Sequence, residues 1–181
     1  RDLHSFPTRR SSDLALVGAS NEDTSGGAVH VFGRDEGGWG NWGPVGRLRA
    51  EGMAANDYFG SSVAMDGNLA VVGMQGDDAQ GEFSGTARVL AWSGNRWWFE
   101  QRLDYVSPDL HNNDRLLGRS VSLDDDHLVA GGCSFGWQPL MPRAVVFRRH
   151  VPGTATPWVA VAERPGSIFH DSTTEIGRAH V

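Results

Sequence analysis

Acidic residues in short turns are the first candidates for chemistry in this sequence. The run Asp124–Asp126 places three acids in a row, and the pair Asp77–Asp78 follows a glycine. Calcium binds about six to eight oxygen ligands, many of them carboxylates. Neighbouring side chains in a strand or tight turn diverge, so adjacent acids rarely meet at one ion. We therefore interpret both stretches as hydrated turns, with a metal site at Asp124 and Asp126 as the alternative.

Tryptophan is the second residue type that could recognise a ligand. Its aromatic face can stack on a sugar ring, but it also fills protein cores. Trp42, Trp97 and Trp158 recur at equivalent places of the repeat described below, which favours packing. Trp137 stands in a non-repeating loop and is the candidate for an exposed ligand contact.

Two residue patterns of common enzymes are missing. H-E-x-x-H and C-x-x-C do not occur, and the histidines are scattered. Gly38–Gly43 fits the letters G-x-G-x-x-G, but it falls at an expected hairpin turn with no helix after it. The single Cys133 excludes an internal disulfide and a cysteine-based zinc cluster, and we expect an inert packed thiol. We predict no catalytic residue, no cofactor and no enzymatic activity.

The two ends of the chain do not share the pattern of the rest. Residues 1–14 read as the translation of a sequencing-library adapter, and residues 175–181 as that of the opposite adapter. We expect both ends to be foreign to the gene and to pack against nothing, because such segments were never selected to bury a face.

The charge of the chain argues against two classes of partner. The net charge is −6, and it becomes −7 when the four arginines and three acids of the two ends are left out. Nucleic acids and anionic membrane surfaces both attract basic proteins. No apolar run approaches the ~20 residues that span a bilayer. We therefore expect neither nucleic-acid binding nor membrane insertion. All basic residues are arginine, and with the 24 glycines this suggests a GC-rich, bacterial gene.

A repeat of about 55 to 58 residues organises the middle of the chain. The corresponding segments are Asp57–Gly73 with Asp114–Gly131, Leu16–Ala19 with Val71–Met74, and Gly27–Phe32 with Gly85–Leu90 and Pro142–Phe147. Three copies are present, and the first lacks its opening strand. The middle copy predicts strands at 62–65, 69–72, 86–92 and 96–103. Asp66-Gly67 predicts a tight hairpin between the first two, and no helical period is seen.

The repeat resembles a known family. Phe59-Gly60 followed by Ala70–Met74 is similar to the FG-GAP signature of integrin-like β-propellers, most of all in their bacterial branch. The third copy departs from it, with Leu117-Gly118 and Gly131–Cys133 at the matching places. The motif residues are Phe59, Gly60, Gly73, Gly85, Gly118 and Gly131. The calcium loop of integrin-type blades is reduced here to Asp66–Asn68, too short to wrap a cation.

The resemblance implies an all-β fragment of a β-propeller, with about three four-stranded antiparallel blades out of about six to eight. The expected division is 1–14 adapter, 15–55 partial blade 1, 56–108 blade 2, 109–166 blade 3, 167–174 unassigned and 175–181 adapter. The implied function is that of a binding or scaffold module, whose partners are a protein or other ligand and the remaining blades. The implied location is extracellular, cell-surface or periplasmic. A carbohydrate-binding or glycan-processing propeller and a purely structural array are the alternatives.

Overall fold

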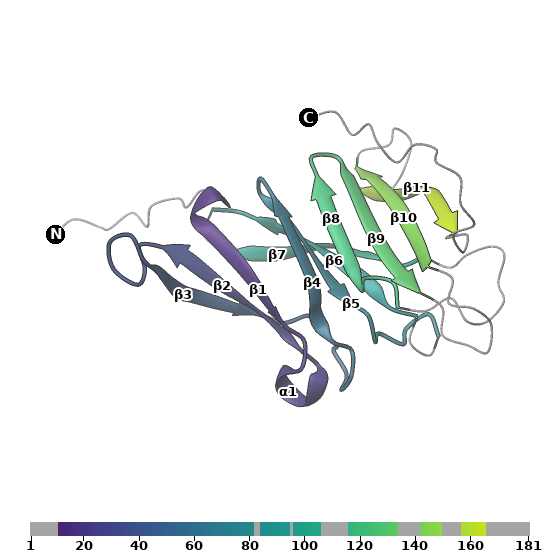
Figure 1. Cartoon of the computed structure of the whole chain (residues 1–181), viewed down its shortest axis with the longest axis horizontal. Coiled ribbons are helices and arrows are strands. Elements are labelled where there is room, and N and C mark those ends of the chain that lie inside the picture. The colour runs from purple at the N-terminus through teal and green to yellow at the C-terminus, as the bar shows by residue number, and fades with distance from the viewer. Residues whose placement is uncertain are drawn as a thin grey trace, which may run out of the picture.

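The protein is an all-β molecule of three antiparallel sheets placed side by side (Figure 1). This computed structural model describes residues 11–81, 84–94, 96–105, 116–133, 142–149 and 157–165. The all-β fold expected from the repeat is therefore confirmed, with one sheet for each copy.

Each sheet is a simple meander in which consecutive strands pair. Sheet 1 has three strands, β1 (Leu14–Ala19), β2 (Ala28–Arg34) and β3 (Trp42–Leu48). Sheet 2 has four, β4 (Phe59–Asp66), β5 (Leu69–Met74), β6 (Thr86–Trp92) and β7 (Trp97–Leu103). Sheet 3 also has four, β8 (Ser120–Asp124), β9 (His127–Cys133), β10 (Pro142–Arg149) and β11 (Trp158–Pro165). The four strands predicted for the middle copy are present, and among the described residues sheet 1 lacks a counterpart of β4.

The tight hairpin predicted at Asp66-Gly67 is also confirmed. Asp66 pairs with Leu69, and Gly67 takes the left-handed φ of 51° that a two-residue hairpin requires. In sheet 3 Asp125 takes the same role with a φ of 50°. Gly38–Asn41 forms the turn that precedes β3, and a strand follows it instead of the helix that a dinucleotide site needs.

All three sheets share an irregularity at one place. The pairing of the last two strands skips a single residue, which is Val45 in β3, Glu100 in β7 and Val161 in β11. A bulge of this kind bends its strand and redirects the side chains next to it. Because the bulge and the register recur, residues of the three sheets can be compared position by position.

Successive sheets touch through their backbones. Gly27 forms an isolated parallel bridge with Phe59, and Gly85 forms the equivalent bridge with Leu117. The N–H of Phe59 donates to the carbonyl of Gly26 at 2.9 Å. Through these contacts β4 lies beside β1, and β8 lies beside β4 and β5 (Figure 1).

Two pairs of glycines make the closest approach between sheets. A Cβ atom on Gly73 would lie 1.8 Å from the carbonyl oxygen of Gly118, and one on Gly18 would lie 2.1 Å from that of Gly60. Gly60 and Gly118 also have φ values of 88° and 84°, a conformation that glycine adopts freely. Both the close approach and the conformation therefore require glycine at these motif positions.

Two apolar layers fill the spaces between the sheets. The first includes Val29, Phe59, Val72, Met74 and Leu90, and the second is built around Val71, Val89, Leu128, Phe147 and Trp158. All six residues of β5 are buried, because sheet 1 covers one face of sheet 2 and sheet 3 covers the other. Sheet 2 is thus the centre of the molecule.

The expectation that residues 1–14 pack against nothing is wrong at Leu14. This residue opens β1, pairs with Gly33 and is only 4% exposed. An apolar side chain at the strand position next to Ala15 can extend the sheet whatever its origin. Residues 1–10 and 175–181 lie outside the described residues.

Two short helical turns occur among the described residues. A single 3-10 turn, η1 (Ser11–Asp13), precedes β1, and α1 (Glu22–Ser25) follows it. Asp23 and Thr24 have φ values of 50° and 60°, so α1 is a left-handed turn and not a regular helix. The turn leads the chain to Gly26, the residue that accepts the inter-sheet bond from Phe59.

Replacing Gly73 by alanine is expected to unfold the contact between sheets 2 and 3. The new methyl group would overlap the Gly118 carbonyl, which is backbone and cannot rotate away. We expect a loss of about 3 kcal/mol in the free energy of unfolding, measured by chemical denaturation. Gly46→Ala is the matched control, because a Cβ there meets nothing within 4 Å. Equal effects of the two substitutions would contradict the close-approach argument.

Candidate functional site

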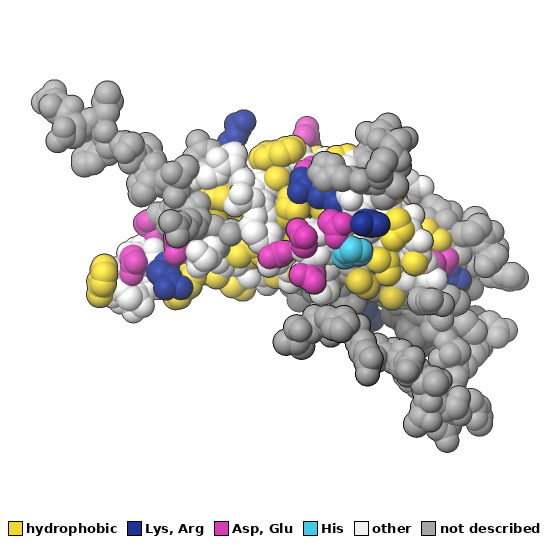
Figure 2. All heavy atoms as spheres, turned by 90° about the horizontal axis from the view of Figure 1, so that it is seen from above, with side chains coloured by type: hydrophobic (Ala, Val, Ile, Leu, Met, Phe, Trp, Pro, Cys, Tyr) yellow, Lys and Arg dark blue, Asp and Glu magenta, His cyan; other side chains and the backbone are white. Residues whose placement is uncertain are grey.

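The acids at the ends of two neighbouring hairpins are held by protein partners. A carboxylate oxygen of Asp126 lies 2.5 Å from Nδ1 of His127, and the other accepts a hydrogen bond from Nε of Arg148 at 3.2 Å. The backbone N–H of Asp125 donates to Asp66 Oδ2 at 2.7 Å. Figure 2 looks onto this end of the molecule, where acidic side chains lie beside a histidine and an arginine. The carboxylate of Asp66 therefore ties the β4–β5 turn to the β8–β9 turn, and that of Asp126 holds the β8–β9 turn to β10.

The two candidate calcium ligands differ in their surroundings. Desolvation alone would raise the pKa of Asp126, but the hydrogen bond from Arg148 and the charges of His127 and Arg148 outweigh it and lower that pKa. Asp124 is exposed and pairs with His127 across the hairpin. In the part of the chain that the structure describes, no group of three or more His, Cys, Asp or Glu side chains could hold a metal ion.

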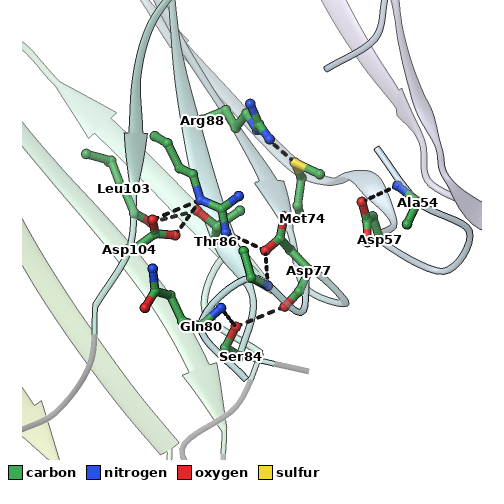
Figure 3. A network of polar contacts seen from close by, with 12 residues as sticks. Ala54, Asp57, Met74, Asp77, Gln80, Ser84, Thr86, Arg88, Leu103 and Asp104 are labelled. Carbon is green, nitrogen blue, oxygen red and sulfur yellow. Dashed lines mark hydrogen bonds and ion pairs between the residues drawn. The ribbon is translucent and has the colours of Figure 1, made fainter. Parts of the chain in front are cut away.

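The interpretation of Asp77–Asp78 as a hydrated turn is wrong for Asp77. Its side chain is 5% exposed and forms an ion pair with Arg102. Nε of Arg102 also donates to Asp104 at 2.7 Å, and the N–H of Ala79 donates to Asp77 Oδ1 at 3.0 Å (Figure 3). The partner is an arginine two strands further along the same sheet, which the local sequence does not show. The network fixes the loop between β5 and β6.

Asp57 is the second buried acid, just before the Phe-Gly motif. It is 5% exposed, and Oδ2 accepts the N–H of Ala54 at 2.7 Å (Figure 3). Burial raises the pKa of Asp57, and the bond from Ala54 offsets this only in part. Its own carbonyl accepts the N–H of Gly76 at 3.1 Å, so Asp57 joins the segment before β4 to the loop after β5.

The three repeated tryptophans have different surroundings. Trp158 is 1% exposed, which confirms the predicted packing. Trp97 is half-buried, packs against the first apolar layer and contacts the ring of Trp92 at 5.4 Å. The packing predicted for Trp42 is wrong, because this residue is 45% exposed. The guanidinium of Arg34 lies over its ring, 5.5 Å from the centroid. Trp158 and Trp97 each pack against the preceding sheet, whereas the described residues provide no sheet before Trp42.

A polar clasp closes the interface between sheets 2 and 3. The amide of Gln101 donates to the carbonyl of Trp158 and accepts its N–H, both at 2.8 Å. The neighbouring Glu100 accepts the indole N–H of Trp158 at 3.1 Å and pairs with Arg149 at 2.6 Å. These bonds join residues that are 57 or 58 positions apart, which is the spacing of the repeat. Because polar side chains of β7 bridge the two sheets here, we call this interface sealed.

The outer face of sheet 1 is an open apolar surface that the strand register identifies. Val17 is 51% exposed, whereas the residues at its position in the other two sheets, Val72 and Ala130, are fully buried. Trp42 lies on the same sheet. This face therefore presents the residue types that are buried between sheets elsewhere in the molecule.

Two tryptophans outside the repeated positions are also exposed. Trp39 is 95% exposed in the turn before β3, and Trp98 is 46% exposed. The glycines Gly38 and Gly40 on either side of Trp39 were a usable signal for a turn. Trp137, the predicted ligand contact, lies outside the described residues.

Comparison with known families bears on the middle of the chain. Residues 42–90 match the family model of the FG-GAP repeat. The FG-GAP match runs from β3 to β6 and includes Phe59, Gly60, Gly73 and Gly85 of the motif. No curated protein matches the chain. Among the described residues no helix is long and apolar enough to cross a membrane.

Calcium at millimolar concentration is expected to leave the melting temperature unchanged. Asp126 already bonds to Arg148, and Asp124 and Asp126 are too few ligands for the ion. Thermal melts with calcium and with a chelator test this. A rise of several degrees that Asp124→Asn or Asp126→Asn removes would contradict the prediction.

Asp57→Asn is expected to change the pH dependence of stability. Because burial raises the folded pKa of Asp57 above its usual value of 3.8, its contribution to stability is present below that pH and is lost as pH rises through the folded pKa. Asparagine removes this loss. The melting temperature of the variant relative to the parent should therefore increase between acid and neutral pH. A difference that does not change with pH would contradict the assignment.

Proposed function

We propose that this chain is part of a β-propeller-type module that binds a protein or another ligand and catalyses no reaction. The FG-GAP match and the three stacked sheets support the architecture. The carboxylates Asp57, Asp77 and Asp126 support the absence of catalysis, since their bonds hold turns and loops together. Integrin-like relatives, a bacterial source and a setting outside the cytoplasm are part of the proposal through the family resemblance alone.

The open face of sheet 1 is the observation that carries this function. Each inner face in the molecule is covered by the next sheet, and exposed apolar area of this kind marks an interaction site. The occupant that fits best is another sheet of the same repeat, because Trp42 and Val17 stand where Trp97 and Val72 meet a sheet within this chain. Remaining blades or a second copy would supply it.

The whole chain is expected to self-associate through this face. Light scattering after size exclusion should show dimers or larger species for the parent, and Trp42→Asp should shift them toward monomer. Trp98→Asp is the matched control, since Trp98 is equally exposed, at 46% against 45%, but belongs to sheet 2. A monodisperse parent monomer with a sharp cooperative melt would overturn the role of the open face.

The exposed tryptophans favour a glycan ligand as the second candidate. Trp39 offers a fully open aromatic ring, and Asp35 accepts the N–H of Gly40 at 2.6 Å and orders the same turn. Aromatic faces of this kind can stack on sugar rings. Glycan-array binding that is lost in Trp39→Ala or Trp137→Ala would favour this candidate over a protein partner.

A further inference from the structure

A cleft lies between sheets 1 and 2, on the side of β3 and β7. Its volume is about 470 Å³, within the range of small-molecule sites. The apolar part of its lining comes from Leu48, Phe59, Leu90, Trp97 and Phe99. The charged part comes from Arg49, Arg88 and Glu51, so cations outnumber acids in the lining.

Comparison with the sealed interface explains why this cleft is open. In the strand register Val45 and Gly46 of β3 take the places of Glu100 and Gln101 of β7. The carboxylate and the amide that hold Trp158 between sheets 2 and 3 therefore have no counterpart facing Trp97. A Cβ on Gly46 would meet nothing within 4 Å, which shows that space is left where the amide would stand.

Arg88 has an unusual set of partners for a partly desolvated guanidinium. Its Nε contacts the sulfur of Met74 at 3.2 Å (Figure 3). Its Cζ lies 5.3 Å from the ring centroid of Phe99. No carboxylate pairs with it among the described residues. Asp77 and Asp104 both bind Arg102 instead.

Desolvation and then the nearby charge of Arg102 lower the pKa of Arg88. The charges of Asp77, Asp104 and Asp57 act in the opposite direction and offset these two effects only in part. A carboxylate that paired with the guanidinium would compensate for its lost hydration. The indole N–H of Trp97 is a second donor at this interface. It is buried without an acceptor among the described residues, whereas the equivalent indole of Trp158 bonds to Glu100.

We propose that the cleft is a binding site for a small organic anion with a flat apolar body. The carboxylate pairs with Arg88, which can donate two parallel hydrogen bonds to it. The apolar body lies against Leu90, Trp97 and Phe99. This inference stands apart from the proposed role of sheet 1, because the cleft lies between two sheets of one chain and not on the open face.

Titration calorimetry of the whole chain with naphthylacetate tests the site. We expect saturable binding of naphthylacetate. The neutral naphthylacetamide should bind about tenfold more weakly, because a charged hydrogen bond is lost. Arg88→Gln should weaken naphthylacetate by a similar factor without affecting naphthylacetamide. Arg34→Gln is the matched control, since Arg34 also lies over an aromatic ring but belongs to the outer part of sheet 1.

A grafted variant keeps the test decisive if Arg88→Gln fails to fold. Val45→Glu combined with Gly46→Gln copies the clasp of the sealed interface into the open one. We expect this variant to melt at a higher temperature than the parent and to lose naphthylacetate binding. Equal binding of acid and amide, equal losses in Arg34→Gln and Arg88→Gln, or full binding by the folded grafted variant would overturn the proposal.

Discussion

The close approach of glycine backbones between neighbouring sheets is the constraint on which the rest of this structure depends. Gly73 meets the carbonyl of Gly118, and Gly18 meets that of Gly60, at distances that no side chain could share. This contact brings β4 against β1 and β8 against β4. Because it recurs at the repeat spacing, one local requirement for glycine sets the stacking of all three sheets.

The side chains of the last strand of each sheet determine whether the interface with the next sheet is closed or leaves a cleft. The bulge at Val45, Glu100 and Val161 recurs, so the same register position faces the next sheet in sheets 1 and 2. Glu100 and Gln101 seal one interface, while Val45 and Gly46 leave the other open. The repeat thus fixes the architecture and permits each interface to differ. A repeated fold can in this way carry a site in one interface and not in the next.

Much of the fold could be predicted because its signals are local or repeated. Alternating β-prone runs and the Asp66-Gly67 turn located the strands, and the internal repeat located the sheets.

The surroundings of single side chains could not be predicted in the same way. Asp77 looked like a hydrated turn residue, because its partner Arg102 lies in another strand. Trp42 looked like core, because the repeat places it where Trp158 is buried, but a packed position also needs a neighbouring sheet. The cleft exists because β3 has Val45 and Gly46 where β7 has Glu100 and Gln101. Only the strand register shows that these positions are equivalent.

Native-state hydrogen exchange at the inter-sheet amides tests the central claim most directly. The N–H groups of Phe59 and Leu117 bond across to the preceding sheets at 2.9 and 3.1 Å. If backbone docking makes the sheets one cooperative unit, these amides should exchange as slowly as those in the middle of β5 and β6, through global unfolding. Exchange as fast as that of amides in the exposed turn at Gly38–Asn41 would show that the sheets separate readily, and would contradict the account.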